Sequence, residues 1–190
     1  MADAGLIAFS FFVPLAVALV LTPPFKRFLV KSGRVVDDAH KRPPTKVPSP
    51  VGRVLFASIL TGEVGAYALS GSLVPVAVAG AAAVAFAVGI YDDLFVLGGK
   101  TKPLLLIFAG APLVLLARFQ AGLYVPSLTF PLLGDTSNHL IIYTLLAVAA
   151  FPIVANAFNM MDSFNGQISW FTLLASAAVL FGTTLRAFFQ

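Results

Sequence analysis

The sequence predicts an all-α polytopic membrane protein with about six transmembrane helices. Hydrophobic residues make up 59% of its 190 residues and charged residues only 11%, whereas a soluble domain carries about 25% charged residues. The mean hydropathy is +0.95. Eight of the twelve basic residues lie between Lys26 and Arg53, which is typical of a cytoplasmic loop between membrane spans rather than of a nucleic-acid-binding surface. The chain has no cysteine, so disulfides, thiolate metal sites and thiol catalysis are excluded.

Four spans are predicted in the first 119 residues. The first covers Gly5–Leu21, and Pro23-Pro24 is expected to end it. No basic residue precedes this run, so a cleaved signal peptide is the less favoured alternative. The apolar stretch Val54–Tyr91 would be about 57 Å long as one helix, nearly twice the bilayer core. We therefore expect a break at Ser70-Gly71-Ser72, which divides this stretch into spans at Val54–Leu69 and Leu73–Tyr91. A further span is expected at Pro103–Phe119.

The region Ala121–His139 is predicted to be an external loop. It carries Pro126 and Pro131, and Gly134-Asp135 is typical of a turn, so a short hairpin is expected here. A fifth and a sixth span follow, at Leu140–Ala155 and Ile168–Leu185. The chain is predicted to be one transmembrane domain covering residues 1–190.

The basic loop predicts the orientation of the spans. If Lys26–Arg53 is cytoplasmic, the N-terminus lies outside. Alternating crossings then place three polar segments on the cytoplasmic face: the basic loop, Asp92–Lys102 and Asn156–Gly166. This convergence predicts a site at that face. We expect a multi-pass protein of a prokaryotic plasma membrane rather than of the endoplasmic reticulum.

Two adjacent carboxylates, Asp92 and Asp93, end the third predicted span. Acids at membrane depth cost roughly 2.5–3.5 kcal/mol and are candidates for function, although a solvated helix end is the alternative. A carboxylate at a helix C-terminus opposes the helix dipole, so the pair needs a cation. Mg²⁺ is held by one or two carboxylates together with substrate phosphates. Lys100 and Lys102 follow on the same loop, as membrane anchors or as phosphate contacts.

Two further clusters contain polar side chains. Asn156, Asn159 and Asp162 are spaced to share one helix face, and Asn165 follows them; a plain Asn-rich loop is the alternative. The segment Asp37–Pro44 holds His40 and Lys41 without helical periodicity and is predicted to be a loop. Contact with anionic lipid headgroups is the alternative to a catalytic role for this loop.

Together these motifs resemble the polyprenyl-phosphate N-acetylhexosamine-1-phosphate transferases, a family that includes the MurNAc-pentapeptide translocase and the GlcNAc-1-phosphate transferases. The resemblance rests on three motifs in order: Asp37-x-x-His40-Lys41 followed by Ser49-Pro50-Val51-Gly52, Asp92-Asp93 followed by Lys100, and Asn156-x-x-Asn159-x-x-Asp162-x-x-Asn165-Gly166. Arg53 stands where the family has a second glycine, and Ser163 where it has a small residue before glycine. The family domain has about ten spans, so the chain is similar to its N-terminal half.

The resemblance implies a reaction and roles for the candidate residues. The family moves N-acetylhexosamine-1-phosphate from a UDP-sugar to a membrane polyprenyl phosphate and releases UMP. It implies catalytic and Mg²⁺-binding roles for Asp92, Asp93 and Asp162, with Mn²⁺ as a substitute metal. It implies that Asn156, Asn159 and Asn165 orient the nucleotide-sugar, and that Lys100, His40 and Lys41 contact phosphates.

Three alternatives remain open at this stage. The chain could act with a separately encoded C-terminal half or as a homo-oligomer, it could be an incomplete and inactive fragment, or it could be a transporter-like protein with a cation site. A transporter predicts acids near the bilayer midplane and an inverted repeat. The motif acids instead gather at one predicted face, Glu63 lies within the second span, and the sequence shows no repeat. Because the family draws catalytic groups from both halves, the isolated chain is expected to be nearly inactive.

Overall fold

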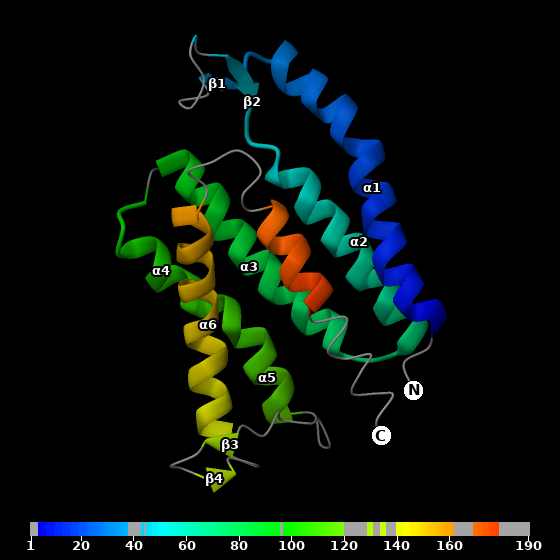
Figure 1. The fold of residues 1–190 in the computed structure, drawn as a ribbon, viewed down its shortest axis with the longest axis vertical. Coiled ribbons are helices and arrows are strands. Elements are labelled where there is room, and N and C mark those ends of the chain that lie inside the picture. Colours follow the sequence, from blue (N-terminus) through cyan, green and yellow to red (C-terminus); the bar gives the residue numbers. More distant parts are fainter. Residues whose placement is uncertain are drawn as a thin grey trace. The chain divides into compact units, whose positions relative to one another are not determined.

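The computed structural model describes residues 4–37, 43, 45–95, 97–119, 129–130, 134–135, 140–161 and 169–178. These residues are mostly helical (Figure 1). The chain divides into two compact units, Met1–Pro152 and Ile153–Gln190. The first unit holds the acidic pair and the basic loop Lys26–Arg53.

Helix α1 covers Ala4–Lys31 and includes Pro14, Pro23 and Pro24. The prediction that Pro23-Pro24 ends the first span was therefore wrong. Proline is tolerated inside apolar helices where side-chain hydroxyls and neighbouring helices satisfy the backbone. Here Leu29, beyond both prolines, is fully buried, so packing against neighbouring elements holds this part of α1 in place.

A left-handed glycine ends α1. Gly33 has φ 68°, and the Arg34 amide donates back to the Leu29 carbonyl at 2.9 Å, as in a Schellman cap. The next segment differs from the predicted loop, because β1 (Val35–Asp37) and β2 (Lys46–Pro48) pair antiparallel, with Asp37 opposite Lys46. Each strand has only three residues, which is too few for the alternation typical of a strand to be recognised in the sequence. Asp38, His40 and Lys41 lie outside the described residues.

Helix α2 (Gly52–Ser70) packs against α1 through a stripe of residues at four-residue spacing: Val54, Ser58, Gly62 and Ala66. A Cβ atom on Gly62 would overlap the ring of Pro14, and one on Gly65 would overlap the ring of Phe9. Glycines at these two positions therefore let α1 and α2 approach closely, as small residues do between membrane helices.

The break predicted at Ser70-Gly71-Ser72 is confirmed. Gly71 has φ 65° and its amide donates to the Tyr67 carbonyl, and α3 (Val74–Phe95) then begins. Helix α3 lies beside α2 (Figure 1), and the rings of Phe56 and Phe86 stack with centroids 4.1 Å apart. The chain then returns along α3 as α4 (Thr101–Leu106), a 3₁₀ turn η1 (Ile107–Gly110) and α5 (Ala111–Phe119).

Three helical segments of the described residues are long and apolar enough to cross a membrane: Gly5–Lys31, Val74–Phe95 and Thr101–Phe119. The six predicted spans and their orientation stay predictions. The expected hairpin is confirmed, because β3 (Thr129–Phe130) pairs with β4 (Gly134–Asp135). Helix α6 covers Leu140–Met161, and a further helix covers Ser169–Ala178. In the second unit, Phe158 contacts Phe171 edge to face at 5.5 Å.

Candidate functional site

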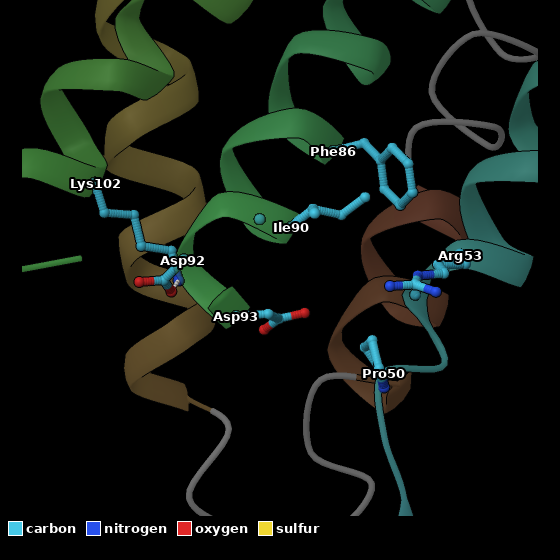
Figure 2. A pocket seen from close by; sticks show the side chains of 9 residues that line it. Pro50, Arg53, Phe86, Ile90, Asp92, Asp93 and Lys102 are labelled. Carbon is cyan, nitrogen blue, oxygen red and sulfur yellow. Dashed lines mark hydrogen bonds and ion pairs between the residues drawn. The ribbon is translucent and has the colours of Figure 1, made fainter. Parts of the chain in front are cut away.

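The two acids of the pair point to different sides of the last turns of α3. Consecutive helical residues are rotated by about 100° around the axis, so their carboxylates diverge. Figure 2 shows Asp92 beside Lys102 and Asp93 directed toward the side on which Arg53 lies. The local helix geometry therefore gives the two carboxylates different surroundings.

Asp92 is held by two hydrogen bonds. Its Oδ2 accepts one from Lys102 Nζ at 2.7 Å, and its Oδ1 accepts one from the Leu97 amide at 2.8 Å. The Lys102 and Asp92 side chains are 31% and 23% exposed, so solvent screens the ion pair and its contribution to stability is about 1 kcal/mol. The two bonds fix the loop that joins α3 to α4, and Lys102 supplies the cation that an acid at a helix C-terminus needs.

The acidic pair opens onto a pocket of about 170 Å³, called here the charged pocket. Four of its lining side chains are charged, and they come from three helices: Arg53 from α2, Asp92 and Asp93 from α3, and Lys102 from α4. The other lining residues are Pro50, Gly52, Phe86, Gly89 and Ile90 (Figure 2). This pocket places carboxylate oxygens and cationic nitrogens around one cavity, as a site for an anion and a metal ion requires.

A second cavity of about 410 Å³, the hairpin pocket, adjoins the charged pocket. Pro50, Arg53, Ile90 and Asp93 line both cavities. Arg34, Ser49 and the β1 residues Val35 and Val36 complete the wall on the hairpin side. The β1–β2 segment thus extends the site and adds a second arginine to it.

The structure separates the two lysines of the loop. Lys100 was the candidate phosphate contact, yet its side chain is exposed and it does not line the charged pocket. Lys102, two residues later on α4, lines the pocket and pairs with Asp92. Arg53 was not among the candidate residues. The signal that could have found it was its place in the glycine motif, where the family has another glycine.

The remaining candidates belong to the second unit or lie outside the described residues. Asn156 and Asn159 lie on α6 three residues apart, a spacing that places two helical positions on one face. Asp162 and Asn165, like His40 and Lys41, lie outside the described residues. The shared site of the three motifs therefore stays a prediction.

The donor set of the charged pocket fits Mg²⁺ in part. Asp93 offers carboxylate oxygens to the cavity, whereas both oxygens of Asp92 already accept hydrogen bonds. Within the described residues, no three His, Asp or Glu side chains lie together as metal ligands. Mg²⁺ usually keeps several waters and binds through one or two carboxylates plus substrate phosphates. Asp93 can therefore serve as a protein ligand only if phosphates, water or residues beyond the described ones complete the shell.

Two archaeal proteins are similar to this chain, and both carry the provisional name UDP-N-acetylglucosamine–dolichyl-phosphate N-acetylglucosaminephosphotransferase. The protein of Sulfolobus acidocaldarius is 32% identical over 93 residues, which are 49% of this chain and 27% of that protein. The protein of Saccharolobus solfataricus is 27% identical over 158 residues, 81% of this chain and 47% of that protein. The chain thus spans less than half the length of each of these curated relatives. No solved structure gave a significant match.

The sequence pattern of glycosyl transferase family 4 matches residues 75–187. This range is more than half of the chain and contains the acidic pair, Lys102 and the Asn-rich motif. It begins within α3, so α1, the β1–β2 hairpin and α2 lie before it. The resemblance seen in the motifs is confirmed, and the chain belongs to glycosyl transferase family 4.

Proposed function

We propose that this chain carries part of the active site that transfers N-acetylglucosamine-1-phosphate from UDP-N-acetylglucosamine to a polyprenyl phosphate such as dolichyl phosphate. Family membership and the names of the two archaeal relatives support the reaction class. The observation that carries the proposal is the charged pocket, where Asp93, Arg53 and Lys102 converge at the end of an apolar helix long enough to span a membrane. A reaction between a lipid-borne anion and a water-soluble anion needs charged side chains at the end of a membrane helix, where both substrates can bind.

The reaction is a phosphoryl-type transfer between two anions. An oxygen of the lipid phosphate forms a bond to the phosphorus that carries the sugar. The bond from that phosphorus to the bridging oxygen breaks, and UMP leaves with that oxygen. Catalysis of such a step is almost entirely positioning and neutralisation of charge, which cationic side chains and a metal provide.

The residues of the charged pocket divide this work. Asp93, which faces the cavity and has no hydrogen bond or ion pair to another described residue, would hold Mg²⁺ and face the lipid phosphate. Asp92 keeps Lys102 at the pocket wall through the 2.7 Å ion pair, so Lys102 can contact a phosphate oxygen. When bound, Mg²⁺ supplies charge neutralisation on the diphosphate. Asp162 is proposed as a further metal ligand.

The nucleotide-sugar is proposed to meet the other motifs. Asn156, Asn159 and Asn165 would orient it with their amides, and Lys100, His40 and Lys41 would contact phosphates. Because the chain spans less than half of each relative, the groups that complete the site are proposed to lie outside the described residues. This is the reason to test the protein in its own membrane.

The proposal is tested in membranes of the organism that produces the chain, with substitutions introduced into its gene. Radiolabelled UDP-N-acetylglucosamine is supplied, and the label is measured in the organic extract. We expect Mg²⁺-dependent labelling, at least tenfold lower for Asp93→Asn because a ligand carboxylate is lost. Asp135→Asn, in the β3–β4 hairpin, is the matched control and should leave it unchanged. Equal loss for both variants, or labelling that EDTA does not reduce, would contradict the assignment.

A further inference from the structure

Arg53 lines three neighbouring cavities of the first unit. Two are the charged pocket and the hairpin pocket. The third, called here the apolar groove, has a volume of about 430 Å³ and lies between α1 and α2. Arg53 therefore lies where the apolar groove adjoins the charged pocket and the hairpin pocket.

Apart from Arg53, every residue that lines the apolar groove is apolar: Leu21, Pro24, Phe25, Phe28, Val54 and Ala57. The first four belong to α1, within the candidate membrane span Gly5–Lys31. Phe25 and Phe28 stack with centroids 6.1 Å apart. This wall exists because α1 continues past Pro23-Pro24; a helix that ended at Leu21 would provide none of the aromatic side.

The guanidinium of Arg53 is available to a ligand. Among the described residues, none forms a hydrogen bond or an ion pair with it, and its side chain is half-buried. Arginine offers five N–H donors in a planar fork that matches phosphate oxygens. A half-buried arginine that has no partner among the described residues and lies beside an apolar cavity favours an anionic group attached to an apolar chain.

We infer that the apolar groove holds the first isoprene units of the acceptor polyprenyl phosphate, with its phosphate bound by Arg53. This rests on the proposed function. A single long apolar chain with one terminal anion matches the groove and its single cationic residue. A UDP-sugar has no apolar tail to occupy the groove.

The position of Arg53 determines on which side of the apolar groove the phosphate binds. Arg53 and Asp93 line the charged pocket together and line the hairpin pocket together. A phosphate on Arg53 therefore lies on the side of the groove that adjoins Asp93. The arginine also offsets the repulsion between the phosphate and that carboxylate.

The inference is tested by photo-crosslinking in nanodiscs of neutral phosphatidylcholine. The purified 190-residue chain carries p-benzoylphenylalanine in place of Phe28, which lines the groove and is 55% exposed. The probes are radiolabelled polyprenyl phosphate, the corresponding polyprenol, and phosphatidylglycerol. We expect at least tenfold more labelling by polyprenyl phosphate than by either of the others at equal concentration.

Variants separate the two parts of the site. Arg53→Gln should lower labelling by polyprenyl phosphate to the level of polyprenol, and Arg53→Lys should keep part of it. Arg118→Gln, which removes the same charge from α5, should change nothing. Ala57→Trp, which fills the groove, should lower labelling by every probe. Helicity by circular dichroism and elution as a single species identify variants that still fold, and only these are compared.

Two results would overturn the inference. Equal labelling by all three probes would make the groove a general lipid contact, and undiminished labelling of Arg53→Gln would remove the role of the arginine. Sugar-phosphate transfer in native membranes distinguishes this failure from failure of the proposed function. Transfer with an unchanged KM for polyprenyl phosphate in Arg53→Gln refutes the inference alone, whereas Arg53-dependent crosslinking without transfer in the wild type refutes the proposed reaction alone.

Discussion

The pair of helices α1 and α2 differs along its length. In its middle, Gly62 and Gly65 bring the backbones together, so that a single added carbon would overlap Pro14 or Phe9. At the end that carries Arg53, the same two helices leave an apolar groove of about 430 Å³. Side-chain size therefore sets the separation of the two helices: small residues bring the backbones together in the middle, while Pro24, Phe25 and Phe28 keep the end with Arg53 open.

The largest expected effect is an all-or-none difference in accessibility between the two ends of α2. Ser49 precedes α2 on the hairpin side, and Ser72 follows it. If α2 crosses the membrane, single cysteines at Ser49 and Ser163 should react with an impermeant maleimide from the cytoplasmic side, and one at Ser72 only from the other side. Sealed vesicles of known orientation provide the measurement, and the cysteine-free chain is its own blank. Opposite labelling of Ser49 and Ser163 would refute the shared face of the three motifs.

The packed part should be the most sensitive to added volume. Gly62→Leu should lower the free energy of unfolding by about 3 kcal/mol, because overpacking displaces neighbours and the ring of Pro14 cannot rotate away. Gly65→Leu should cost less, since the Phe9 ring can swing aside. Gly89→Ala is the control, because a Cβ there meets nothing within 4 Å. Unfolding in detergent, followed by circular dichroism, measures all three, and equal values for Gly62 and Gly65 would contradict this explanation.

At the charged end, function should change more than stability. Asp93→Asn should lower sugar-phosphate transfer at least tenfold, equivalent to about 1.4 kcal/mol, and leave thermal unfolding unchanged, because no hydrogen bond or ion pair ties Asp93 to another described residue. Transfer and thermal unfolding are measured on the same preparations. A large loss of stability would instead make Asp93 a structural residue.

The Asp92–Lys102 pair should contribute to stability where Asp93 does not. A double-mutant cycle with Asp92→Asn and Lys102→Gln should give a coupling free energy of about 1 kcal/mol, since both side chains are partly exposed. The coupling should fall in high salt. The pair Asp93 and Lys102, measured in the same way, serves as the control and should show a smaller coupling. Equal couplings would mean that the divergence of the two carboxylates has no energetic consequence.

The smallest effect is expected at the turn that joins α2 to α3, remote from the charged pocket. Gly71→Ala should cost about 1 kcal/mol, because φ 65° is unfavourable for a residue with a Cβ. Gly71→Asn should cost less, since asparagine tolerates this conformation. Thermal unfolding compares the two variants, and transfer should be unaffected in both. A loss of transfer would show that the two ends of α2 are coupled.

Features that depend only on neighbours along the chain can be predicted from the sequence. The apolar composition, the break at Ser70-Gly71-Ser72, the short hairpin and the acidic pair at the end of α3 all follow from composition, turn chemistry and helical spacing. The family also followed from the order of its motifs. These signals are local, so no distant contact is needed to see them.

Which side chains share the site depends on how the helices pack, and the sequence did not predict it. Pro23-Pro24 indicated a helix end, yet α1 continues to Lys31 with Leu29 fully buried beyond both prolines. Spacing did not distinguish Lys100 from Lys102, whereas the turn between α3 and α4 brings only Lys102 to Asp92. Arg53 and Asp93 are far apart in sequence and line one cavity because α2 and α3 pack side by side. Such encounters depend on the separation of whole helices, which side-chain volumes set and which no local pattern encodes.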